Sequence, residues 1–305
     1  MLSSKFEIKK IKKYLYVKIK SSKYKYKGEE NELVPFDTLS IKFHPSVQII
    51  GKGAFRECES LTLIDLPPSL HTIEAYAFAC CKSLRHIVIP PSVHTIEAYA
   101  FAHCKSLRSI EIPSSVQIIG RNAFAACTSL QSIEIPQAVH TIRNGTFMNC
   151  SSLTYVGISP FVHTIQVGAF LNCQSLARIR IPQSVNTIRK CAFAGCISLN
   201  SIEIPSSVDI IESYAFYQCT SLQSARVSKN CVIHKSSFSE LTQVIRTCWH
   251  ELGPIILMRE LYLRRRAIPL PFYESSHYCH VLKLIQFFLI DANEDIFRTV
   301  LDFLA

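Results

Sequence analysis

A 23-residue unit that repeats in register constrains this chain more than any other feature of its sequence. The unit reads V-x-x-I-x-x-x-A-F-x-x-C-x-S-L-x-x-I-x-I-P, and no insertion interrupts eight successive copies. A fixed period of this length is typical of a solenoid, in which each unit buries its apolar face against its neighbours. The three most regular columns of the repeat are the phenylalanines Phe55, Phe78, Phe101, Phe124, Phe147, Phe170, Phe193 and Phe216, the cysteines Cys58, Cys81, Cys104, Cys127, Cys150, Cys173, Cys196 and Cys219, and the leucines Leu61, Leu84, Leu107, Leu130, Leu153, Leu176, Leu199 and Leu222.

Each unit predicts two short strands joined by a tight turn. The I-x-I segment, such as 110–112, alternates apolar and polar residues as a strand with one buried face does. The proline that follows it, such as Pro113, ends the strand because it fixes φ and has no N–H to donate. The V-x-x-I segment, such as 93–96, is β-branched and predicts a second strand or an extended edge. The A-F-x-x-C segment between them predicts a single 3₁₀ or α turn.

Eight copies of A-F-x-x-C-x-S-L make the chain resemble the BspA-type leucine-rich repeat family over about residues 41–241. The resemblance implies a mainly β repeat solenoid with short parallel strands. Characterised members act by binding other proteins, so it also implies a non-enzymatic scaffold for a protein or peptide partner. We expect a lysine-rich, β-rich N-terminal cap over 1–40, eight full repeats and a degenerate ninth over 41–241, and an α-helical C-terminal cap over 242–305.

The net charge of +10 is concentrated at the N-terminus, where residues 1–27 hold ten lysines and a single acid, Glu7. Alternating residues within 14–27 predict two strands, arranged as a hairpin, that cap the first coil. One interpretation is a lysine–tyrosine patch over residues 5–27 that binds nucleic acid or anionic lipid. The other is a solvated cap whose lysines prevent edge-to-edge aggregation.

The thirteen cysteines raise the question of compartment, because eight of them form one column of the repeat. Free cysteine packs well as a small buried hydrophobe. A disulfide ladder is the alternative, but no apolar signal segment precedes residue 40. We therefore expect a reduced interior and a cytoplasmic or nuclear protein. A surface adhesin is a further alternative, which needs an export route.

The outward positions of the L-x-x-I-x-I segment are the candidate partner-binding surface. Acidic side chains in earlier coils meet basic ones in later coils, with Tyr155 at the join, and tyrosine and arginine are frequent interface anchors. An ordinary solvated face is the alternative. The repeat loses its consensus at Gly157, Ser159 and Phe161, which predicts an irregularity or an exposed apolar spot nearby. The candidate residues are His86, Glu111, Glu134, Tyr155, Arg178, Arg180, Glu203 and Arg226.

No catalytic, cofactor or metal site is expected from the remaining motifs. Two histidine pairs in adjacent copies, His71 with His94 and His140 with His163, could bind a metal or sense pH, but neither has a visible third ligand. The C-terminal Cys/His residues have no recognised zinc spacing, and no phosphate-binding glycine loop is present. These C-terminal residues are Cys248, His250, His277, Cys279 and His280.

The C-terminal sequence predicts helices over 241–252, 255–266 and 280–289, and a last helix that begins at Asp291. Its most apolar stretch, 284–290, is much too short to span a bilayer, so no transmembrane segment is expected. We expect a monomer.

Overall fold

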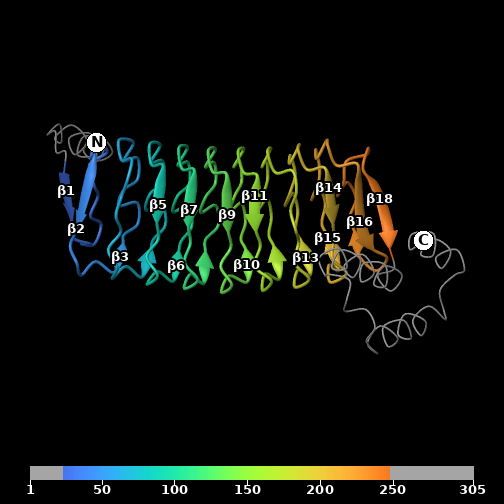
Figure 1. The fold of residues 1–305 in the computed structure, drawn as a ribbon, viewed down its shortest axis with the longest axis horizontal. Helices are drawn as coiled ribbons and strands as arrows, with labels where there is room; N and C mark the ends of the chain where they lie inside the picture. The colour runs from blue at the N-terminus through green and yellow to red at the C-terminus, as the bar shows by residue number, and fades with distance from the viewer. Residues whose placement is uncertain (1–22, 248–305) are drawn as a thin grey trace, which may run out of the picture. The chain divides into compact units, whose positions relative to one another are not determined.

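The computed structural model describes residues 23–247, which form a stack of parallel coils (Figure 1). Two series of short strands run along this stack, one from each strand segment of the repeat, as the sequence predicts. The first series consists of β2 (Ser40–Phe43), β5 (His86–Val88), β7 (Ser109–Glu111), β9 (Ser132–Glu134), β11 (Tyr155–Gly157), β14 (Ser201–Glu203), β16 (Ser224–Ser228) and β18 (Gln243–Thr247), and strand β1 (Lys23–Tyr26) precedes it. The second series is β3 (Ile49–Ile50), β4 (Thr72–Ile73), β6 (Thr95–Ile96), β8 (Ile118–Ile119), β10 (Thr141–Ile142), β12 (Thr164–Ile165), β13 (Thr187–Ile188), β15 (Ile210–Ile211) and β17 (Val232–Ile233).

Neighbouring coils pair in parallel with the register that the 23-residue period dictates. Ile87 lies opposite Ile110 in the first series, and Ile96 lies opposite Ile119 in the second. The first series is not continuous, because its hydrogen-bonded groups are β1–β2, β5–β7, β9–β11 and β14–β16–β18. Two of its expected strands, at 62–66 and 177–181, are extended segments without strand pairing. These two interruptions lie on the candidate binding surface.

A single apolar core runs through the stack, with the phenylalanine column at its centre. The eight consensus phenylalanine rings stack on one another with centroids 5.0 to 5.7 Å apart and planes within 3° to 13° of parallel. The phenylalanine, cysteine and leucine columns are at most 2% exposed. The regular spacing of the repeat therefore identified the core correctly.

The turn around each phenylalanine differs from the predicted 3₁₀ or α turn. The expected i to i−3 hydrogen bonds form, as from Ala102 N–H to the Tyr99 carbonyl at 3.1 Å. They alternate with bonds to the next coil, such as Phe101 N–H to the Ala123 carbonyl at 2.8 Å. In every consensus coil, the residues two before and two after the phenylalanine have positive φ, which no right-handed helix allows. Residues 23–247 accordingly contain no helix.

The cysteine column is held by thiol–carbonyl hydrogen bonds between coils. The Sγ of Cys127 donates to the Phe101 carbonyl at 3.1 Å, and that carbonyl also accepts the Cys104 N–H at 3.3 Å. Seven of the eight column cysteines bond the phenylalanine of the preceding coil in this way. All eight are free thiols, so the structure contains no disulfide ladder.

The structure differs from the sequence-based predictions at both ends of the stack. Strand β1 pairs in parallel with β2, and the other strand of the expected N-terminal hairpin lies outside the described residues. Gln243–Thr247 forms strand β18 beside β16, where the sequence predicted the start of a helix. Backbone pairing with the last coil outweighs the local helical spacing there. The ninth coil forms, since Phe238 stacks on Phe216 with centroids 4.9 Å apart. The other predicted C-terminal helices lie outside the described residues.

Candidate functional site: the outward strand face

We call the outward side chains of the first strand series the strand face. The structure places all eight candidate partner-binding residues there, at the third or fifth position of the L-x-x-I-x-I segment. Seven are exposed and His86 is half-buried, while the isoleucines between them, such as Ile110 and Ile133, lie in the core. The candidate residues thus share one continuous surface, and their alternation with buried residues follows from strand geometry.

Glu134, Tyr155 and Gly157 form an interacting cluster at the centre of the strand face. Strands β9 and β11 pair so that Glu134 lies opposite Gly157. Because glycine has no side chain, the Glu134 carboxylate occupies the space where a Cβ at residue 157 would stand. The Glu134 carboxylate raises the pKa of Tyr155, first as the acceptor for its hydroxyl proton and second through its negative charge. Tyr155 is 52% exposed and stands beside this carboxylate.

Arg178 and Arg180 lie in the next coil, in one of the two interruptions of the strand series. Both side chains are exposed, and within residues 23–247 neither guanidinium lies within 4.0 Å of a carboxylate. Arg189 provides the contrast, since it forms an ion pair with Glu212 at 2.7 Å. Two neighbouring cations without an internal counterion can pair with carboxylates of a partner at little cost in broken contacts.

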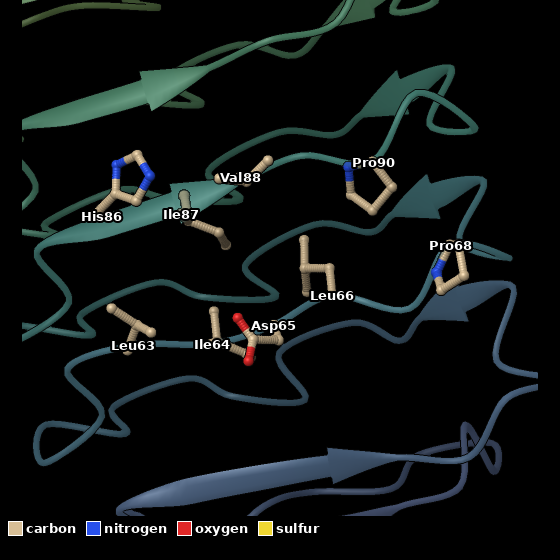
Figure 2. Close-up of a pocket in the computed structure, with 9 residues that line it drawn as sticks. All are labelled: Leu63, Ile64, Asp65, Leu66, Pro68, His86, Ile87, Val88 and Pro90. Atoms are coloured by element: carbon tan, nitrogen blue, oxygen red, sulfur yellow. The ribbon is translucent and has the colours of Figure 1, made fainter.

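The sequence did not predict a shallow hollow of about 280 Å³ on the strand face, in coils nearer the N-terminus than Tyr155 (Figure 2). It lies between the Phe55 and Phe78 coils, and its lining includes Leu63 and Val88, which are 58% and 51% exposed. His86 is at its edge and also hydrogen-bonds the Ser109 hydroxyl, Nδ1 to Oγ 3.1 Å. The signal in the sequence was the presence of Leu63 and Val88 in columns that elsewhere hold mainly polar residues.

The histidine pairs belong to the second strand series. His71 and His94 stack with ring centroids 5.9 Å apart. His140 and His163 meet edge to face, and the Nδ1 atoms of both contact the carbonyl oxygen of Phe161 at 3.1 and 2.6 Å. Phe161 is 47% exposed, as expected, and lies beside this pair. In the described part of the chain, no group of three or more potential ligands is arranged to hold a metal ion. The C-terminal Cys/His residues fall outside that part.

A family model describes most of this chain. The model for the BspA-type leucine-rich repeat region matches residues 36–154 and 140–248, which together exceed two thirds of the sequence. The chain belongs to the BspA-type leucine-rich repeat family. Comparison with curated proteins returned no match.

Several solved structures are similar to this BspA-type solenoid. The pneumococcal vaccine antigen PcpA is 19% identical, with a TM-score of 0.52, over 70% of this chain and 63% of that one. A leucine-rich repeat protein of T. pallidum is 30% identical, with a TM-score of 0.43, over 50% of this chain and 71% of that one. A leucine-rich repeat protein of Bacteroides ovatus is 20% identical, with a TM-score of 0.35, over 69% of this chain and 84% of that one. The likeness to PcpA shows the fold alone. Among residues 23–247, no helix is long and apolar enough to cross a bilayer.

Proposed function

We propose that this solenoid is a non-enzymatic scaffold that binds a protein or peptide partner through its strand face. Repeat solenoids of this family are typically non-enzymatic. The observation that carries the proposal is the surface formed by Tyr155, Arg178 and Arg180. It combines an aromatic anchor with two guanidiniums that have no carboxylate within 4.0 Å among residues 23–247. Buried arginine and tyrosine contacts often contribute most of the affinity of an interface.

The charge order along the face suggests the kind of partner. Glu111 and Glu134 stand in adjacent coils on one side of Tyr155, and Arg178 and Arg180 stand on the other. A partner with the opposite order of charges would gain from both halves, and a partner with the same order would be repelled. The surface therefore favours a dipolar protein or peptide over a uniformly charged polymer.

The test is affinity capture from native lysate with the full chain and with the double variant Arg178→Glu, Arg180→Glu. We expect the variant to bind the captured protein at least about tenfold more weakly, since interface anchors contribute about 2 kcal/mol or more. Its thermal unfolding should match that of the unchanged chain, because both side chains are exposed. The matched control is Arg121→Glu, an exposed arginine in the turn region, which should leave capture unchanged.

A chain without residues 1–22 tests the alternative, in which the N-terminal lysines bind nucleic acid or anionic lipid. This deletion retains β1, whose Tyr26 is fully buried against Phe55. Binding that survives the deletion and moderate salt supports the strand face. Recovery of nucleic acid or lipid alone, lost on deletion and steeply weakened by salt, would instead support the lysine segment. Equal capture by the Arg178/Arg180 variant and the unchanged chain would contradict the proposal.

A further inference from the structure

The hollow between the Phe55 and Phe78 coils lies where the first strand series is interrupted. Its lining comes from residues 63–68 and from β5 with the two residues after it, which are neighbours in the stack (Figure 2). The N–H of Arg85 donates to the Thr62 carbonyl at 3.2 Å, but residues 63–66 make no backbone hydrogen bond within the described part of the chain. A hydrogen-bonded ladder such as the one that joins β5 to β7 is therefore missing along most of this segment. The backbone groups of residues 63–66 are not paired with the neighbouring coils.

The side chains of the hollow are mainly apolar. Leu63 and Val88 are each more than half exposed, and Leu66 and Pro90 complete the apolar lining. Exposed aliphatic side chains that line a concavity gain free energy when a ligand removes them from water. The equivalent outward positions in the Phe101 coil are the polar residues Ser109 and Glu111, so the apolar surface is specific to this part of the face.

Asp65 is the one acidic group in the lining, and it stands among these apolar side chains. Its carboxylate is exposed and forms no ion pair within 4.0 Å in the described part of the chain. Lys42 and Arg85, the exposed cations of the neighbouring coils, form no ion pair with the Asp65 carboxylate. The hollow thus combines apolar lining side chains with a carboxylate acceptor.

The size of the hollow selects among classes of ligand. Pockets for small molecules usually measure about 300–1,000 Å³ and enclose most of the ligand. A shallow hollow of about 280 Å³ is better suited to one large side chain of a polypeptide that lies across the face. The exposed Asp65 carboxylate can pair with a basic side chain of such a polypeptide, which an acyl chain lacks.

We propose that this hollow holds one large apolar side chain of an extended peptide segment, with a flanking lysine or arginine of that segment paired to Asp65. The inference rests on the proposed function, because it assumes that the strand face binds polypeptides, and it adds the chemistry of one contact. Leu63 and Val88 hold the apolar side chain, and Asp65 sets the preference for a basic neighbour.

The test uses fluorescein-labelled peptides of sequence Gly-Ser-Lys-Leu-Lys-Ser-Gly and measures their binding to the full chain by fluorescence polarisation. Matched peptides replace the central leucine by phenylalanine or alanine, or both lysines by glutamate. We expect the leucine and phenylalanine peptides to bind with Kd below about 1 mM. The alanine peptide should bind about tenfold more weakly, because it buries less apolar area. The glutamate peptide should bind more weakly than the lysine peptide.

Variants of the protein test which of its side chains contact the peptide. The double change Leu63→Ser, Val88→Ser should weaken the leucine peptide at least about tenfold without changing thermal unfolding, since both side chains are mostly exposed. Asp65→Asn should remove the preference for lysine over glutamate. The control Arg121→Glu, an exposed arginine of the turn region, should leave peptide binding unchanged.

Three results would overturn the inference. The first is that no peptide binds with a Kd below about 1 mM. The others are that the Leu63/Val88 variant binds the leucine peptide as tightly as the unchanged chain does, or that the glutamate peptide binds as tightly as the lysine peptide or more tightly. These failures are distinct from failure of the proposed function. If the Arg178/Arg180 variant still loses its captured partner while the hollow fails these tests, the strand face remains the binding surface.

Discussion

Replacing Phe124 with alanine should lower the free energy of unfolding by about 3–5 kcal/mol. The side chain is fully buried, and its ring stacks on Phe101 and Phe147 with centroids 5.5 and 5.7 Å away. Its removal opens a cavity between two neighbouring rings that the backbone hydrogen bonds of three coils hold in place. Because each coil is stabilised mainly by its neighbours, the loss should extend to the adjacent coils. Urea unfolding followed by circular dichroism measures it.

The control for this substitution is Phe161→Ala, which removes the same atoms from a side chain that is 47% exposed. We expect a change within about 1 kcal/mol. If both variants lost similar stability, the division of the repeat into core and surface columns would be incorrect.

Raising the pH above 9 should destabilise the solenoid through its buried cysteines. Burial raises the pKa of the Cys150 thiol to about 12, and burial shifts the other seven column thiols in the same direction. Below pH 9 the thiol is protonated in both the folded and the unfolded chain, so its contribution to the free energy of unfolding is fully present. Between pH 9 and 12 only the unfolded chain releases the proton. Stability then falls by about 1.4 kcal/mol per pH unit for each thiol.

The matched variant is Cys150→Ser, which can keep a hydrogen bond to the Phe124 carbonyl but does not titrate in this range. The difference in unfolding free energy between the unchanged chain and this variant should be constant from pH 7 to 8. By pH 10 it should shift by about 1.4 kcal/mol in favour of the variant. For all eight thiols together, the loss by pH 10 is on the order of 10 kcal/mol. A difference that stays constant up to pH 10.5 would show that Cys150 is accessible and titrates normally.

The sequence predicted the core well because each coil repeats the same environment. Phe124, Cys127 and Leu130 are fully buried, as are their copies in adjacent coils, so the spacing alone assigns them to the interior. The same spacing placed Tyr155 and Arg178 correctly on the outward face. Both results follow from the alternation of side chains along a strand and need no knowledge of the turns.

Features that depend on contacts between coils were beyond the sequence. Ala126 has a φ of 58°, a conformation that its own preferences disfavour, because its N–H must donate to the Met148 carbonyl of the next coil. The helical spacing around Val244 gave a wrong prediction, because the open edge of the last coil offers strand pairing to the same residues. The interruption at 63–66 has no signature in the repeat itself, and only the apolar residues Leu63 and Val88 mark the hollow in the sequence.

Photo-cross-linking tests the central claim, that the strand face is the working surface, most directly. A photoreactive phenylalanine analogue would replace Tyr155 on the strand face in one chain and Arg121 in the turn region in another. Both chains would be exposed to native lysate, illuminated and purified under denaturing conditions. The account predicts one or a few specific protein adducts at position 155 and none of these at position 121. The same adducts at position 121, without any at position 155, would contradict it.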